Sequence, residues 1–206
     1  MTETTRPPFI LASGSASRRQ MLDAAGLPHA AIASQVDEPA VRRSLEANNG
    51  GAVDASRLAV ALARAKAEDV SAAHPGAVVV GADQVLALGT RLFEKPRDLD
   101  DARAHLAAFR GRTHTLHAAV AIAVDGQAAW HHVDVAHMTM RAFTPEFVDA
   151  YIARAGRAIL GSVGAYQLEG LGIQLFERIE GDYFTILGMP LLPLLAELRN
   201  RKVIAA

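Results

Sequence analysis

Hydrophobic residues are arranged along this chain in short runs that have the periods of strands and helices. Residues 9–12 form a continuous apolar run and residues 77–88 have continuous valine before Gly81, a pattern typical of strands covered on both faces. Two further strand-like runs, residues 113–124 and 128–141, flank an Asp-Gly pair that predicts a hairpin turn. Since strands otherwise alternate with helices, the pattern predicts an α/β fold with a mixed twisted sheet and flanking helices.

The helices are predicted mainly from the residues at which they begin and end. Asp54, Asp98 and Thr144 stand where a side chain can cap the first turn of a helix. The predicted helices cover residues 18–25, 55–73, 99–109, 145–152 and a final segment after Pro190, residues 30–34 and 173–179 are predicted strands, 161–172 is rich in glycine, and 180–182 is a turn. The loop at residues 48–51 is too short to separate domains, so we expect residues 1–206 to form one domain.

Composition narrows the class of protein. The 206 residues include 21 Lys and Arg against 22 Asp and Glu, a balance that argues against a protein that coats nucleic acid. The absence of cysteine excludes disulfides, thiolate metal sites and a cysteine nucleophile. The longest stretch without a charged residue, residues 183–196, contains two prolines and is too short to span a bilayer. We therefore expect a cytoplasmic protein that binds neither nucleic acid nor a membrane.

The first candidate site is the polar segment between the strand at 9–12 and the helix that follows it. Ser13, Ser15 and Ser17 supply hydroxyl groups, and Arg18 opens the helix. Because a helix start presents unpaired N–H groups and positive partial charge, this combination suits a phosphate group. The alternative is that the serines only cap the helix. The glycine and lysine pattern of a P-loop is absent.

The second candidate is Asp83, which interrupts the most hydrophobic strand. An unpaired carboxylate would be costly there, so a cation or a metal ion is expected beside it. Lys66, close to the apolar stripe of its helix, and Lys95, shortly after the strand, are the available lysines. Gly81 suggests that a ligand or a second backbone approaches closely. Alternatively, Asp83 lies at the rim of the sheet and both lysines extend into solvent.

Two metal hypotheses are open. Asp37 and Glu38 offer the hard oxygen ligands that Mg²⁺ prefers when it also binds phosphate, although a simple turn would explain them equally well. A zinc site is disfavoured, because histidines three apart on a strand, or adjacent to each other, point to different faces. The pairs in question are His114 with His117 and His131 with His132.

Seven segments, taken in order, resemble the Maf family over residues 9–199. They are Leu-Ala-Ser-Gly-Ser-Ala-Ser-Arg-Arg at 11–19, Val-Asp-Glu at 36–38, Ala-Lys-Ala at 65–67, Gly-Ala-Asp-Gln-Val at 81–85, Glu-Lys-Pro at 94–96, Gly-Ala-Tyr at 164–166 with Glu-Gly at 169–170, and Gly-Asp-Tyr at 181–183 with Gly-Met-Pro at 188–190. Each segment is weak evidence alone, whereas the ordered set is specific.

The resemblance implies a nucleoside triphosphate pyrophosphatase, which hydrolyses a nucleotide to its monophosphate and pyrophosphate. It also implies two lobes around a cleft, a divalent metal cofactor (Mg²⁺ or Mn²⁺) and a homodimer. Carried over position by position, it makes Asp83, Lys66 and Lys95 catalytic, Ser13, Ser15 and Arg18 phosphate-binding, Glu38 and Asp83 metal ligands, and Ser17, Gln84 and Glu169 determinants of base specificity. Water would attack the α-phosphorus, with Asp83 acting as its base or as a metal ligand.

Departures from the usual family pattern suggest the substrate. Ala16 and Ser17 replace a proline and an arginine, while Gln84 and Glu169 replace a threonine and a glutamine. The last two changes resemble the subgroup that acts on 7-methylguanosine triphosphate. Guanine presents two adjacent donors, which suit a carboxylate such as Glu169, and N7 methylation adds a favourable positive charge. The alternative function is a non-enzymatic, nucleotide-binding regulator of cell division.

Overall fold

A computed structural model describes residues 7–48 and 53–205, and in this part of the chain the strands form one seven-stranded mixed sheet. The strands are β1 (Phe9–Ala12), β2 (Ala30–Ala31), β3 (Val78–Leu88), β4 (Arg91–Phe93), β5 (Thr113–Val124), β6 (Gln127–Met140) and β7 (Phe176–Glu180). Their order is β2-β1-β3-β5-β6-β7, and β4 pairs with β3. Parallel pairing joins β1 to β2 and β3, whereas β4 and β7 pair antiparallel to their neighbours. The predicted mixed sheet is confirmed.

Helices follow the strands in the predicted alternation. They are α1 (Ala16–Ala24), α2 (Glu38–Asn48), α3 (Ala55–Ala72), α4 (Leu99–Phe109), α5 (Pro145–Ala155), α6 (Tyr183–Ile186) and α7 (Leu191–Asn200), with 3₁₀ turns η1 (Gly156–Gly161), η2 (Val163–Ala165) and η3 (Leu171–Leu175). Asp54, Asp98 and Thr144 cap α3, α4 and α5, as predicted. Of the predicted loop at 48–51, residues 49–51 lie outside the described residues.

The chain divides into two compact units. The first unit comprises Met1–Gln84, Ala118–Asp134 and Gly188–Ala206, and the second comprises Val85–His117 and Val135–Leu187. Strands β3, β5 and β6 run from one unit into the other. That residues 1–206 work as one domain stays a prediction.

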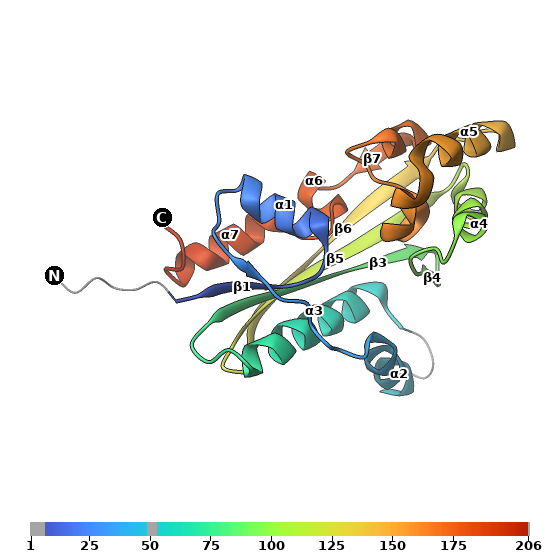
Figure 1. The fold of residues 1–206 in the computed structure, drawn as a ribbon. Helices are drawn as coiled ribbons and strands as arrows, with labels where there is room; N and C mark the ends of the chain where they lie inside the picture. The colour runs from blue at the N-terminus through green and yellow to red at the C-terminus, as the bar shows by residue number, and fades with distance from the viewer. Residues whose placement is uncertain (1–6, 49–52, 206) are drawn as a thin grey trace. The chain divides into compact units, whose positions relative to one another are not determined.

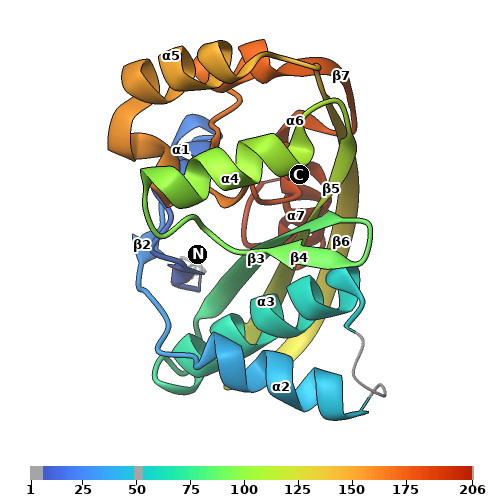
Figure 2. The ribbon, with the colours of Figure 1, turned by 90° about the vertical axis from the view of Figure 1, so that its right-hand side faces the viewer.

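In the first unit, helices cover both faces of the parallel strands. Helix α3 lies on one face, and α1 and α7 lie on the other (Figures 1 and 2). Under α3, Ile10, Ala12, Val70 and Val79 are buried together. The continuous apolar character of β1 and β3 therefore reflects burial on both faces, as the sequence predicted.

The second unit has a larger aromatic core. The side chains of Leu106, Phe109, Met138 and Met140 are fully buried within it. Helix α4 contacts both α5 and the turn η2. Figure 2 shows α4 below α5. This packing holds the irregular segment from η1 to η3 against a regular helix.

Three predictions from the pattern need correction, and three elements were missed. The strand expected at 30–34 is only Ala30–Ala31, and the one expected at 173–179 begins at Phe176, after the 3₁₀ turn η3. Glu38 opens helix α2 rather than lying in a turn, and β4 and α6 were not predicted. The late start of β7 has a tertiary cause. A Cβ at Gly172 would lie 2.4 Å from the Gln167 oxygen, so close packing determines the conformation of the segment before the strand.

Candidate active site

Two parallel strands of the first unit bring the candidate residues to one edge of the sheet. Ala12, the last residue of β1, pairs with Gly81 of β3. Ser13 directly follows that end, and Asp83 lies two residues beyond Gly81. Strand β3 continues to Leu88, so Asp83 lies on β3 just beyond the carboxyl end of β1, and the carboxyl ends of parallel strands are the usual place for ligands in α/β sheets. The fold therefore places the two strongest sequence candidates at a position suited to binding.

Ser13, Ser15 and Arg18 form one hydrogen-bonded group at the start of α1. The Ser13 hydroxyl accepts from the Ser15 N–H (3.2 Å) and from Arg18 Nη1 (3.3 Å). The Ser15 hydroxyl caps α1 by accepting from the Arg18 N–H. The capping interpretation of Ser15 is thus confirmed, and it is compatible with a phosphate cradle because the other N–H groups of the first turn face outward from the helix end.

A backbone carbonyl that the sequence did not reveal fixes the Arg18 side chain. Arg18 Nε donates to the Gly188 oxygen at 2.9 Å. Burial lowers the pKa of Arg18, while the nearby charges of Asp83 and Glu38 raise it. The guanidinium is therefore held in place, partly desolvated and within the field of both carboxylates, where it would attract a phosphate anion.

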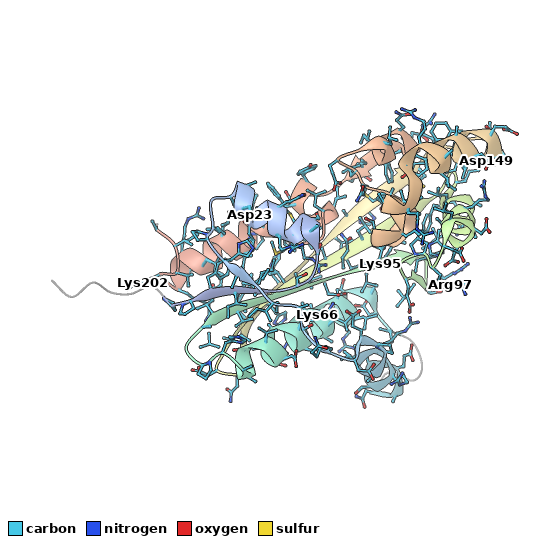
Figure 3. All side chains as sticks on the ribbon, viewed as in Figure 1. Asp23, Lys66, Lys95, Arg97, Asp149 and Lys202 are labelled. Carbon is cyan, nitrogen blue, oxygen red and sulfur yellow. The ribbon has the colours of Figure 1, made fainter. Side chains whose placement is uncertain are left out.

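Lys66 is the cation that Asp83 requires. Lys66 Nζ lies 2.6 Å from Asp83 Oδ1 and 2.6 Å from Glu38 Oε1. Asp83 is buried, with 7% of its surface exposed, whereas about half of the Glu38 side chain is accessible at 52%. Figure 3 shows Lys66 on α3. The lysine consequently does not extend into solvent but joins two carboxylates.

Gly81 makes the Lys66 contact with Asp83 possible. A Cβ at Gly81 would lie 2.2 Å from the Ala63 oxygen and 2.6 Å from the Ala67 nitrogen. Ala63 and Ala67 are themselves fully buried. Helix α3 therefore packs directly on the backbone of β3, and the second backbone suggested by the sequence is the helix that carries Lys66.

The other four predicted site residues are not part of the contacts described above. Ser17 lies in the first turn of α1, and Gln84 follows Asp83 on β3; both are partly exposed. Lys95 and Glu169 belong to the second unit, where both are exposed. Lys95 follows β4 (Figure 3), and Glu169 lies between η2 and η3. The structure thus joins six of the predicted residues within the first unit: Ser13, Ser15, Arg18, Glu38, Lys66 and Asp83.

The donor set suits a hard divalent cation. Glu38 and Asp83 converge on one positive charge, and carboxylate oxygens are preferred ligands of Mg²⁺ and Mn²⁺ when phosphate oxygens complete the coordination. Among residues 7–48 and 53–205, no three His, Asp or Glu side chains are grouped as a metal site. Two carboxylates alone would bind such an ion weakly, and oxygens of a bound phosphate would strengthen its binding.

Three of the four histidines considered for zinc have other contacts, and His131 is exposed. His114 is buried and bonds to Tyr166, and His117 bonds to the Thr115 hydroxyl. His132 pairs with Asp134 at 2.9 Å. In the described part of the chain, no helix is long and apolar enough to cross a membrane.

Comparisons with known proteins find relatives that match most of the chain. The family model described as Maf-like protein matches residues 8–201. Two proteins named 7-methyl-GTP pyrophosphatase, from Rhizobium johnstonii and Rhizobium meliloti, are 54% and 49% identical to this chain, covering 94% and 98% of it and 96% and 100% of their own lengths. A nucleoside triphosphate pyrophosphatase of Granulibacter bethesdensis is 49% identical over 95% of this chain and 98% of its own.

Among solved structures, a nucleoside-triphosphatase described as a dITP/XTP pyrophosphatase, from Mycobacterium abscessus, matches 95% of this chain and 95% of its own. Its sequence identity is 12% and its TM-score is 0.43.

Proposed function

The chain belongs to the Maf family, and on this basis we propose that it hydrolyses nucleoside triphosphates, 7-methyl-GTP among them, to the monophosphate and pyrophosphate. It is a hydrolase of the nucleoside triphosphate pyrophosphatase class. The single structural observation that carries the proposal is the Lys66–Asp83 pair, built at the same sheet edge as the Ser13–Arg18 group. This hydrolysis requires a carboxylate that can act on water and positive charge near the phosphate oxygens. The buried Asp83, its Lys66 partner and the phosphate-binding group beside them supply both.

The residues of the first unit have different roles in the proposed hydrolysis. Ser13, Ser15 and Arg18 bind phosphate oxygens through hydroxyl, N–H and guanidinium groups. Asp83 orients the attacking water and accepts its proton, and Lys66 balances the charge that develops on the phosphate oxygens. We assign Lys95 the same role, to balance the charge on the phosphate oxygens, because it lies at the corresponding position of the family motif.

Glu38 and Asp83 would hold a divalent cation, Mg²⁺ or Mn²⁺, when the nucleotide is bound. Such an ion neutralises charge on phosphate oxygens. The proposal is supported by the convergence of both carboxylates on the Lys66 ammonium, which marks a position where positive charge is stabilised.

Base choice is assigned to Ser17, Gln84 and Glu169, with Glu169 accepting from the two donors of the guanine edge. The support is the name shared by the two Rhizobium relatives. We also propose that residues 1–206 act as one domain, as a homodimer in the cytoplasm, which the family resemblance and the lack of cysteine favour.

Pyrophosphate release tests the proposal directly. The purified chain is incubated with Mg²⁺ or Mn²⁺ and a panel comprising 7-methyl-GTP, GTP, UTP, TTP and dITP. We expect equal amounts of monophosphate and pyrophosphate, with 7-methyl-GTP among the best substrates. Binding of nucleotides without release of pyrophosphate from any of them would instead favour the nucleotide-binding regulator.

A further inference from the structure

A buried polar pair in the second unit plays no part in the chemistry proposed above. His114, on β5, is 1% exposed, and Tyr166, directly after η2, is 4% exposed. His114 Nε2 lies 2.8 Å from the Tyr166 hydroxyl oxygen, a hydrogen-bond distance. Phe109 packs on the His114 ring with 4.7 Å between ring centres, and Phe176 packs against Tyr166 at 4.9 Å. The pair is thus enclosed by aromatic rings.

This arrangement is a poor way to gain stability. His114 Nδ1 is buried and has no hydrogen-bond partner among the described residues. Burial lowers the pKa of His114 to about 4, so the ring is neutral near pH 7. A buried polar pair with one atom unsatisfied contributes less than an apolar pair of the same shape, but it can select one conformation over others. We therefore look for the role of the His114–Tyr166 pair in the conformation of the residues that it holds in place.

The segment anchored by Tyr166 has an unusual backbone. Gly164 has φ +82° and Ala165 has φ +62°, although Ala165 is fully buried. Positive φ is unfavourable for alanine, so surrounding contacts must hold it. One such contact is the Tyr151 hydroxyl, which donates to the Ala165 oxygen at 3.1 Å. The His114–Tyr166 bond is the second, one residue further along.

The turn that follows carries Glu169. Gly170 N–H donates to the Gln167 oxygen at 3.2 Å, which closes the turn at residues 167–170. At its far side Gly172 packs against Gln167 so closely that a Cβ would lie 2.4 Å from its oxygen. The exposed Glu169 side chain therefore extends from a turn that Gly172 packs against on one side and that Tyr166 anchors on the other.

We propose that the His114–Tyr166 hydrogen bond is a positioning device for the Glu169 turn and thereby sets the preference among nucleobases. The inference rests on the proposed function. His114 and Tyr166 act through the turn without touching the nucleotide. Loss of the bond lets residues 166–170 adopt other conformations, so Glu169 meets the guanine edge less often. The phosphate-binding residues of the first unit do not depend on it.

The test compares catalytic efficiencies for 7-methyl-GTP and UTP. Tyr166→Phe removes only the hydroxyl, and His114→Leu removes the ring nitrogen. We expect either change to lower the 7-methyl-GTP to UTP ratio by about three- to tenfold, the range of one neutral hydrogen bond. The loss should lie in KM for 7-methyl-GTP, with kcat nearly unchanged. His114→Gln, whose amide can still bond to Tyr166, should retain most of the ratio.

A matched control separates positioning from general destabilisation. Ile152→Val shortens a buried side chain of the same core and costs about as much stability as one hydrogen bond. It should lower the melting temperature while leaving the ratio unchanged. If Ile152→Val and Tyr166→Phe change the ratio equally, or neither does, the positioning role is wrong.

The link to Glu169 is tested in a double-variant cycle. In a Glu169→Gln background, Tyr166→Phe should have little further effect on the ratio, because both changes act through the same contact. An undiminished effect would place the action of Tyr166 elsewhere and overturn the inference. If the unaltered chain releases no pyrophosphate from any nucleotide, the proposed function fails first and the inference fails with it. A correct activity with an unaffected ratio refutes the inference alone.

Discussion

Lys66 Nζ donates to Asp83 Oδ1 over 2.6 Å, and this contact joins helix α3 to strand β3. Helix α3 lies directly on Gly81 of β3, so a lysine three residues after Ala63 reaches the carboxylate two residues after Gly81. Glu38 contacts the same ammonium from α2. The charge at the centre of the proposed site is thus fixed by backbone packing before any ligand binds.

Asp83→Asn should abolish most of the turnover while preserving the fold. Asparagine keeps the shape of aspartate but cannot accept the proton of the attacking water, so kcat should fall by about 10²–10⁴-fold. The melting temperature should change little, because Lys66 keeps Glu38 as its counter-charge while the desolvation cost of the buried Asp83 carboxylate is removed. Pyrophosphate release and thermal unfolding are measured on the same samples. Asp134→Asn, a carboxylate paired with His132 on β6, is the control and should keep full activity. Full activity in Asp83→Asn would remove Asp83 from the mechanism.

Lys66→Met should destabilise the first unit through the charge that it leaves behind. Asp83 would be buried without the ammonium group that contacts it, which costs about 3 kcal/mol of unfolding free energy. Adding Asp83→Asn to Lys66→Met should restore most of this loss, although activity stays absent. Urea unfolding of the two single variants and the double variant measures the coupling. Arg42→Met breaks an ion pair with Glu46 on α2 that is over one-third exposed, and it should cost less than about 1 kcal/mol. Equal losses for Lys66→Met and Arg42→Met would contradict the buried-pair argument.

Glu169→Gln should weaken the preference for guanine bases and spare the phosphate chemistry. Loss of a charge-assisted hydrogen bond costs about 1.5–3 kcal/mol, and since glutamine still accepts one bond, a tenfold loss of the 7-methyl-GTP to UTP ratio is about what we expect. The ratio of the two catalytic efficiencies is the measurement. Glu177→Gln, an exposed carboxylate on β7, is the matched control. If both activities fall together, Glu169 acts in something other than base choice.

The elements with strong local signals could be predicted from the sequence. Strand β3 has a long apolar run that only Asp83 and Gln84 break, and the Asp125-Gly126 turn adopts positive φ at both residues, as its sequence demands. Helix α2 was missed because none of its residues is buried, so it has no apolar stripe to detect. The strand β4 was missed because three residues are too few to show a period.

The site was predictable only where a side chain carried the signal. Asp83 in an apolar strand demanded a cation, and Lys66 on the inner side of a helix demanded a partner, so each residue pointed to the other. The Gly188 carbonyl that holds Arg18 could not be found this way, because every residue has a carbonyl and only the fold selects one. The position of Glu38 likewise depended on the unpredicted helix α2.

Acid should destabilise the second unit through His114, and the direction follows from its burial. Its pKa is lowered from 6.5 to about 4 in the folded chain, so between these values the unfolded chain binds more protons. The stability from a neutral His114 is therefore complete above pH 6.5 and is lost as the pH falls toward 4, with a total of about 3 kcal/mol. Burial also lowers the pKa of His105, whose ring packs against Phe109, and the contribution of His105 to the pH dependence remains when only His114 is changed.

His114→Gln isolates this contribution, because glutamine does not titrate and keeps a polar group near Tyr166. The free energy of unfolding in urea is measured from pH 7 to pH 4 for both proteins. We expect the unaltered chain to lose stability more steeply than His114→Gln, by up to about 1.4 kcal/mol per pH unit. His131→Gln, at an exposed position on β6, should follow the unaltered chain. Parallel curves for the unaltered chain and His114→Gln would mean that His114 takes up its proton without leaving the core, and that the pair with Tyr166 tolerates a charge.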